Sequence, residues 1–408
     1  MPFATEKYGS QLLLGLFIII CAALVIRIKV EATHYTSPDS HFYMRVADNL
    51  LEGKGLVAPM HLNFPFREKE KEYYFAVWPA GYPLLIAGVS KVTQTSTLVA
   101  SKIVNIIFLG LMFLLLYSWF GRLAWFPALY FCSFNLLEVY SYTWSEGPFL
   151  FFVMYLCFLL HKDQKQEEDS LLFLKLFLCL FSLFMLRYAG IIFYSFAGLY
   201  FLKHLYYREH KKSWHYFTAL VFASGLAFGY LWLNKKNSGF FTGMDRIRPE
   251  AESFSYFTEL LLQGLFNEFA VIRNYYFRDY TDFLFLTLFI VQLGLLYYVI
   301  RQTKQQGGSA VATKAVWKNL LLQAGVYYLL AVTILRKIDP FDEFNYRILA
   351  PFSVPIFIYL LSTLSSESSK PVFRQVWPWL SGFFLLSLLM NLPKQFLIEL
   401  FTGAKLPL

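Results

Sequence analysis

Charged side chains are scarce in this sequence, and long hydrophilic stretches are missing. Asp, Glu, Lys and Arg make up 15% of the 408 residues, against 57% for hydrophobic and 20% for aromatic residues. A typical soluble domain carries about 25% charged residues. The composition therefore excludes an ordinary water-soluble protein and predicts one whose main solvent is the lipid bilayer.

Cysteines are few, and the common phosphate-binding and repeat motifs are missing. The four cysteines all lie within apolar runs, where cysteine behaves as a small hydrophobic residue. We therefore expect neither a disulfide framework nor a cysteine metal site. No Gly-rich phosphate loop, heptad run or solenoid repeat occurs either. These absences disfavour nucleotide-binding loops, coiled coils and repeat scaffolds.

What the chain does have is a series of long apolar runs, many of roughly 17 to 25 residues, enough to cross a bilayer as helices. Helices satisfy their own backbone hydrogen bonds, as a spanning element in lipid must. We predict an all-α polytopic membrane protein with about eleven transmembrane helices, forming one integral membrane domain over residues 1–408 without a separate soluble domain. The helices are expected near 10–29, 98–119, 123–142, 147–161, 171–187, 189–205, 214–233, 283–300, 318–336, 347–364 and 375–391.

The net charge of +9 indicates orientation in the membrane rather than nucleic-acid binding. Lys and Arg are scattered at the ends of the apolar runs, in loops near 161–170, 203–213, 301–318 and 364–375. Because such loops face the cytoplasm, the opposite face is predicted to be the outer one. It receives a first outer loop at 30–97 and a second long outer loop at 234–282.

The first outer loop contains the stretch 37-SPDSHFYMRVADNLLEGKG-55. Ser37 and Pro38 are typical of a helix start, and Gly53 of a helix stop. The apolar residues between them recur at helical spacing. This predicts a helix of about 14 residues and about 20 Å, too short to span and suited to the interface. Asp39 lies in its first turn, either as an ordinary helix-end acid or as a functional carboxylate.

A second interfacial helix is predicted at 78-WPAGYPLLIAGVSKV-92, where Pro79 and Pro83 favour a turn into a helix. Trp78 and Tyr82 stand at its start. They are either interfacial anchors or residues that line a site. Two interfacial helices in one loop indicate more than a connector.

Further polar residues gather on the predicted outer face. Glu146 lies between two predicted spans, and acids at the membrane edge are costly enough to indicate function. Arginine is suited to binding phosphate oxygens, although each arginine alone also fits an interfacial anchor. Carboxylates together with several arginines predict a site that deprotonates one substrate and holds the phosphate of another. The arginines in question are Arg187, Arg246, Arg248, Arg336 and Arg347.

These motifs resemble those of the bacterial C-type (GT-C) glycosyltransferases, in particular the dolichyl-phosphate-mannose-protein mannosyltransferase and aminoarabinose-transferase-like group. The resemblance rests chiefly on 39-DSHFYMRVADNLLEGKGL-56 and 79-PAGYPLLIA-87. Weaker support comes from 144-WSEGPF-149, 187-RYAG-190, 242-TG-243 and 347-RILAP-351. Many relatives carry two adjacent acids in the first loop, whereas here Ser40 and His41 follow Asp39.

The resemblance implies a GT-C-like fold in the bacterial plasma (inner) membrane, with interfacial helices over a cavity on the outer, periplasmic side. It also implies a polyprenyl-phosphate sugar donor and transfer with inversion to a lipid, glycan or protein acceptor. Asp39 would be the general base, and Glu146 would position the acceptor, a metal or an arginine. The arginines and Tyr188 would bind the donor phosphate, and the remaining candidates, which would line the acceptor side, are His41, Tyr43, Trp78 and Tyr82.

Other functions stay open on the sequence alone. A transporter or flippase of a lipid-linked glycan, or a glycan ligase or polymerase, would also need many spans and outer arginines. No cofactor is firmly implied, although Mg²⁺ or Mn²⁺ fits the carboxylates. His34, His41 and His61 share the first outer loop, but their spacing matches no compact metal motif. No metal site is therefore predicted.

Overall fold

A computed structural model provides the fold and describes residues 7–59, 72–167, 169–242, 252–276, 281–305, 319–338, 341–366, 369–396 and 398. These residues form two compact units, and α5 contributes residues to both. Unit 1 comprises Met1–His34, Gly110–Ser141 and Ala251–Leu408. Unit 2 comprises Tyr35–Leu109 and Tyr142–Glu250.

Helices dominate both units. The segments up to the middle of the chain are α2 (Gly9–Val30), α3 (Pro38–Leu51), β1 (Val57–Pro59), β2 (Glu72–Tyr74), α4 (Gly81–Thr93), α5 (Thr97–Phe120), η1 (Gly121–Leu123), α6 (Trp125–Ala128), η2 (Leu129–Cys132), α7 (Phe134–Ser141) and α8 (Glu146–Gln164). They are followed by α9 (Leu172–Leu186), η3 (Tyr188–Gly190), α10 (Ile191–Tyr206), α11 (His210–Ser238), α12 (Phe254–Phe269), α13 (Phe283–Gln305), α15 (Leu320–Ile338), α16 (Tyr346–Leu364) and α17 (Lys370–Met390).

Within the described residues, seven helices are long and apolar enough to cross a membrane, and α7 with α8 makes an eighth if the two count as one broken span. The seven are α2, α5, α11, α13, α15, α16 and α17, each of which overlaps a predicted span. The prediction of an all-α membrane protein is thus confirmed, whereas the structure supports seven or eight spans rather than about eleven.

The predicted span at 123–142 is wrong as a continuous helix. In its place lie short segments: η1, α6, η2 and α7. Gly121 has a positive φ of 59°, Pro127 has no N–H to donate, and Ser133 is extended. Gly121 opens the first short helix and Ser133 separates η2 from α7, so the chain forms no continuous helix here, although the run is apolar enough to span.

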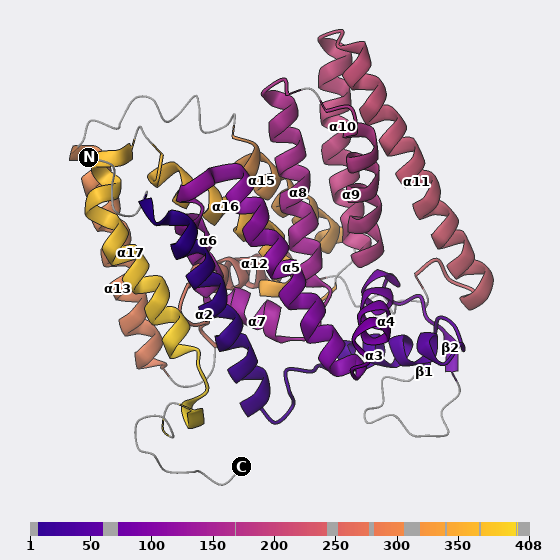
Figure 1. Ribbon diagram of the computed structural model, residues 1–408, viewed down its shortest axis with the longest axis horizontal. Helices are drawn as coiled ribbons and strands as arrows, with labels where there is room; N and C mark the ends of the chain where they lie inside the picture. The colour runs from indigo at the N-terminus through magenta and orange to yellow at the C-terminus, as the bar shows by residue number, and fades with distance from the viewer. Residues whose placement is uncertain are drawn as a thin grey trace. The chain divides into compact units, whose positions relative to one another are not determined.

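The predicted spans at 171–187 and 189–205 form α9 and α10, which have only 15 and 16 residues. Both are shorter than the ~20 residues that a span normally needs. They pack with α8 and α11 in unit 2, where α9, α10 and α11 run alongside one another (Figure 1). Neither helix is long enough to count among the seven candidate spans.

The two helices predicted in the first outer loop are confirmed as α3 and α4, which pack against each other. Ser37 caps α3 and forms a reciprocal capping box with Ser40. Gly53 follows the helix with a positive φ of 76°, a conformation that favours glycine. The loop also contains a two-stranded antiparallel ribbon, β1–β2, which the sequence analysis did not predict.

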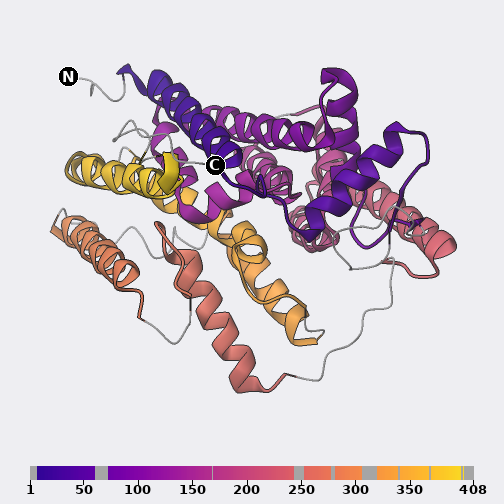
Figure 2. The same cartoon turned by 90° about the horizontal axis from the view of Figure 1, so that it is seen from below.

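Unit 1 is built around α16, which packs along α15 and also contacts α12, α6 and α7 (Figures 1 and 2). The helix α12 lies within 234–282, which was predicted to be a loop. Its apolar run is interrupted by Glu259 and Glu268, so the hydropathy pattern gave no span there. Ser253 caps its start by accepting a hydrogen bond from the Tyr256 N–H (3.2 Å).

Candidate functional site

Glu146 is the first residue of α8, directly after the irregular stretch 142–145 that separates α7 from α8. Its side chain is only 2% exposed. The first turn of a helix favours a carboxylate, because the unpaired N–H groups and the helix dipole are positive there. The break before α8 therefore places a buried acid at a helix N-terminus.

Arg187 provides the opposite charge. It follows the last residue of α9 with extended backbone and forms an ion pair with Glu146; its side chain is 23% exposed. Desolvation makes each of two such charges costly alone, and their proximity offsets that cost. One of the five arginines predicted to bind the donor and the second predicted acid therefore lie side by side in unit 2.

Tyr43 connects this pair with Asp39. Burial raises the pKa of the Tyr43 hydroxyl, the negative charges of Glu146 and Asp39 raise it further, and Arg187 acts in the opposite direction. All three charged groups therefore act electrostatically on the Tyr43 hydroxyl. We call Asp39, Tyr43, Glu146 and Arg187 the acid–arginine cluster. Of the predicted site residues, Glu146 and Arg187 are in direct contact, and both act electrostatically on Tyr43, as Asp39 does.

Aromatic side chains pack next to the acid–arginine cluster. The Tyr43 ring meets Tyr82 edge-on at 5.2 Å between centroids and Trp78 at 5.8 Å. Tyr82 is fully buried, and its hydroxyl donates to Asn105 Oδ1 (3.1 Å). Trp78 and His41 are partly exposed, and burial lowers the pKa of His41. Tyr82 therefore lies in the interior, and Trp78 and His41 are the more accessible of the predicted lining residues.

Tyr188 follows Arg187 directly, and its hydroxyl group forms hydrogen bonds within the protein. Its hydroxyl donates to the carbonyl of Ala76 (2.8 Å) and accepts from the Asn234 side chain (3.0 Å). These bonds join the segment before α4 to the end of α11. The Tyr188 hydroxyl thus has a structural partner on each side, and its predicted role at the donor phosphate remains a prediction.

The other predicted arginines are not seen beside Glu146: two of them belong to unit 1, and two lie outside the described residues. Arg336, at the end of α15 in unit 1, is 2% exposed and pairs with Glu252 (2.7 Å). Arg347 lies in the first turn of α16, also in unit 1. Arg246 and Arg248 lie outside the described residues.

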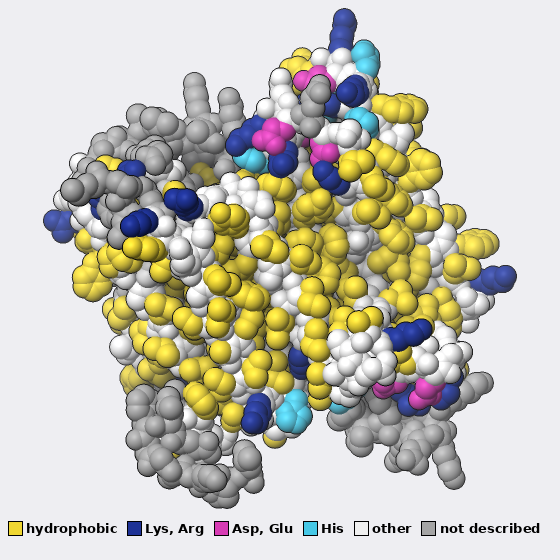
Figure 3. Space-filling model, in the orientation of Figure 1, with side chains coloured by type: hydrophobic (Ala, Val, Ile, Leu, Met, Phe, Trp, Pro, Cys, Tyr) yellow, Lys and Arg dark blue, Asp and Glu magenta, His cyan; other side chains and the backbone are white. Residues whose placement is uncertain are grey.

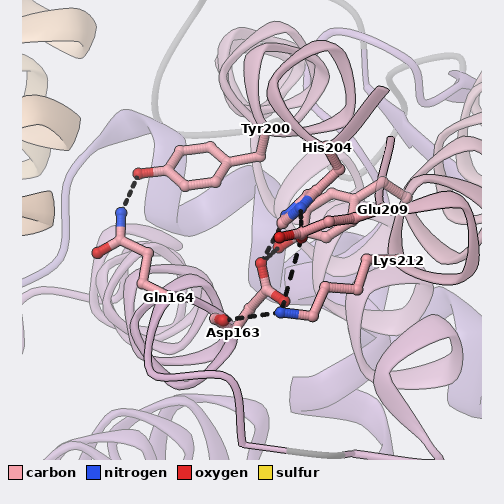
Figure 4. A network of polar contacts seen from close by, with 7 residues as sticks. Asp163, Gln164, Tyr200, His204, Glu209 and Lys212 are labelled. Atoms are coloured by element: carbon pink, nitrogen blue, oxygen red, sulfur yellow. Dashed lines mark hydrogen bonds and ion pairs between the residues drawn. The ribbon is translucent and has the colours of Figure 1, made fainter. Parts of the chain in front are cut away.

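A second polar cluster in unit 2 lies at the opposite end of α8, where Asp163 is about 26 Å from Glu146 along the helix axis. His204 lies between Asp163 and Glu209, with both separations 2.6 Å, and Lys212 contacts Asp163 at 3.0 Å (Figure 4). Tyr216 also donates to Asp163 (3.2 Å). This cluster ties α8, α10 and α11 together near the basic loops, where charged side chains gather above a hydrophobic face (Figure 3).

Several buried polar residues were missed by the sequence analysis. Ser101, Lys102 and Asn105 lie within a predicted span, yet all three are buried. They form hydrogen bonds to the chain just before Asp39 and just before Glu146. A lysine and an asparagine inside an apolar run were the signal that could have identified them. In unit 1, burial raises the pKa of Glu268 to about 8, and Asn135 donates to its carboxyl group (3.1 Å).

The described residues contain no group of three or more His, Cys, Asp or Glu side chains that could hold a metal ion. His34 and His41 belong to this described part of the chain, whereas His61 lies outside it.

No family model matches the sequence, and no curated protein matches it either. Two solved structures have a similar fold, both of ArnT from Cupriavidus metallidurans at 12% sequence identity. The apo state gives a TM-score of 0.56 over 91% of this chain and 62% of ArnT. The form bound to undecaprenyl phosphate gives a TM-score of 0.57 over 93% of this chain and 62% of ArnT.

At this identity the similarity establishes the fold alone. The resemblance to the aminoarabinose-transferase-like group that the motifs indicated is therefore confirmed as a resemblance of structure over more than nine-tenths of the chain. The chain spans 62% of the length of the ArnT chains that it matches.

Proposed function

We propose that this chain is a membrane glycosyltransferase that moves a sugar from a polyprenyl-phosphate donor to an acceptor hydroxyl. The observation that carries the proposal is the acid–arginine cluster, which combines two acids and an arginine around Tyr43. It lies in a fold similar to that of ArnT, one structure of which is bound to undecaprenyl phosphate.

Asp39 is the general base in this proposal. It takes the proton from the acceptor hydroxyl while the acceptor oxygen forms a bond to the anomeric carbon of the donor. The bond between that carbon and the phosphate oxygen breaks, and polyprenyl phosphate leaves with the electron pair. Attack from the face opposite the phosphate inverts the configuration at the anomeric carbon.

Arg187 stabilises the leaving phosphate, and Glu146 holds the guanidinium in position. A fixed cation is effective where negative charge develops, because it needs no reorganisation during the reaction. Arg246, Arg248, Arg336, Arg347 and Tyr188 remain further candidates for the donor phosphate. His41 and Trp78, the partly exposed residues, are proposed to face the acceptor, with Tyr43 and Tyr82 supporting them from the interior.

The reaction is proposed to take place on the outer face of the plasma membrane. The acid–arginine cluster and the basic loops lie at opposite ends of α8, and basic loops favour the cytoplasmic side. An interfacial α3 places Asp39 at the depth of lipid headgroups, where a lipid-linked sugar phosphate would lie.

The test is release of polyprenyl phosphate by the purified protein from a panel of polyprenyl-phosphate sugars. Asp39→Asn is expected to reduce turnover by about 100-fold or more, because a general base contributes about that much. Glu52→Gln, an exposed acid just after the same helix, serves as the matched control and should keep wild-type turnover.

Full turnover by Asp39→Asn would remove Asp39 from the role of base. If the wild-type protein releases no polyprenyl phosphate from any donor in the panel, the glycosyltransferase proposal fails, and transport of a lipid-linked glycan becomes the better explanation.

A further inference from the structure

Three polar side chains on the N-terminal half of α5 have no part in the function proposed so far. Ser101 and Asn105 are fully buried, and Lys102 is 7% exposed. At positions i, i+1 and i+4 they share one side of the helix. A buried ammonium group is costly in an apolar helix unless it has fixed partners.

Lys102 binds the segment that leads into α3. Its Nζ donates to the carbonyl oxygen of Tyr35 (2.9 Å), four residues before Asp39. The same carbonyl accepts a hydrogen bond from the Thr143 N–H (3.2 Å). Lys102 therefore anchors the point at which the chain carrying Asp39 meets the chain carrying Glu146.

Ser101 and Asn105 bind the second of these two segments. The Ser101 and Thr143 hydroxyl groups share a hydrogen bond of 2.8 Å, and the Asn105 amide donates to the carbonyl of Tyr142 (2.6 Å). Asn105 also accepts the hydrogen bond from Tyr82, so α4 is joined to the same point.

The two segments also bind each other directly. Ser40, the neighbour of Asp39, donates from its hydroxyl to the Thr143 carbonyl (3.0 Å). Trp144 donates from its indole nitrogen to the Ser37 hydroxyl (2.8 Å), and its ring stacks on Tyr142 at 4.0 Å. Asp39 and Glu146 thus each follow closely after a segment that forms hydrogen bonds with side chains of α5.

We propose that Ser101, Lys102 and Asn105 are positioning residues. They hold segments 35–40 and 142–146 in a fixed relative position, so that Asp39 and Glu146 act at the same bound substrate. This inference rests on the glycosyltransferase function proposed above. The three residues touch backbone and support side chains rather than the substrate. They act on the reaction by fixing the separation between the base and the Glu146–Arg187 pair.

The first measurement tests whether α5 holds segments 35–40 and 142–146 together, and it does not depend on activity. Hydrogen–deuterium exchange of the full-length protein in detergent reports on the Thr143 amide, which donates to Tyr35. Lys102→Met removes the donor and leaves an unbranched side chain that is one atom shorter, and it should speed exchange in peptides covering 142–146 by about tenfold through local opening. Lys91→Met, an exposed lysine on α4, is the control and should leave this exchange unchanged.

The second measurement is release of polyprenyl phosphate from the donor that the wild-type protein uses. A small displacement of a catalytic group can cost about 10- to 100-fold in rate, so Lys102→Met should lower kcat by that factor with little change in KM. Ser101→Ala should lower kcat less, and Ser101→Thr, which keeps the hydroxyl, should recover turnover. If Lys102→Met does not fold, both measurements are made on Ser101→Ala and Ser101→Thr instead.

The outcomes separate the two proposals. Faster exchange at 142–146 together with a lower kcat supports the positioning role. Faster exchange with wild-type kcat overturns it, and so does unchanged exchange in both Lys102→Met and Ser101→Ala. If the wild-type protein turns over no donor, the function fails on its own, whereas the exchange data still decide whether α5 holds the two segments together.

Discussion

Glu146 and Arg187 compensate each other's charge where little water reaches them, and each depends on the other. Neither could be paired from the sequence, because they come from different helices and each alone fits a common role at a helix end. Asp39 was easier to locate, since Ser37, Pro38 and the apolar stripe define its helix from neighbouring residues.

Removing the charge of Arg187 alone should destabilise the protein more than removing the charges of Arg187 and Glu146 together. Arg187→Gln leaves the Glu146 carboxylate buried without its cation, at a cost of about 3 kcal/mol. The double variant Arg187→Gln/Glu146→Gln should recover most of that loss, because no isolated charge remains. Thermal unfolding in detergent measures the difference.

Equal destabilisation of the single and the double variant would contradict this prediction. It would mean that packing of the two side chains, rather than charge compensation, accounts for the contribution of the pair.

The helix α4 lies against α9 at a point where only glycine fits. A Cβ at Gly81 would come within 2.3 Å of the Met185 carbonyl oxygen, two residues before Arg187. The motif 79–87, which carried part of the resemblance, therefore has a physical reason for its glycine. It lets α4 approach the end of α9 from which Arg187 projects.

Gly81→Ala should push α4 away from α9 and lower stability by about 1–3 kcal/mol, as overpacking does. It should also reduce polyprenyl phosphate release, because the Arg187 backbone lies at the same contact. Gly88→Ala on the same helix is the matched control, since nothing lies within 4 Å of its added Cβ. That variant should keep or slightly raise the melting temperature.

A wild-type melting temperature for Gly81→Ala would show that the two helices adjust without cost. The structural account of the glycine would then be wrong, whatever the effect on activity.

The distribution of charge over the chain predicts which end of unit 2 faces which side of the membrane. Lys91 at the end of α4 belongs to the first outer loop, and Lys211 at the start of α11 belongs to a basic loop. Both side chains are exposed, whereas Cys132, Cys157 and Cys179 are buried and Cys21 is half-buried. Introduced cysteines can therefore report on topology against a low background.

A membrane-impermeant maleimide should label Lys91→Cys in intact cells, and Lys211→Cys only after the membrane is permeabilised. This follows from the preference of basic loops for the cytoplasm. The reverse pattern of labelling would put the acid–arginine cluster on the cytoplasmic side and would contradict the proposed outer-face reaction.

The sequence by itself determined the membrane environment, the positions of the seven long apolar helices among the eleven spans predicted, and the short helices α3 and α4. Each follows from neighbouring residues: apolar length for a span, and Ser37, Pro38 and Gly53 for the bounds of α3. Local rules suffice there because a helix forms its hydrogen bonds within a few residues of chain.

Only the tertiary structure decided where the apolar chain breaks, and which polar side chains meet. The helical path is interrupted between residues 121 and 145. The Glu146–Arg187 ion pair and the hydrogen bond of Lys102 to Tyr35 join residues that are distant in sequence. Periodicity and propensity do not encode such partners, because burying a polar group is tolerated only when packing brings another group to satisfy it.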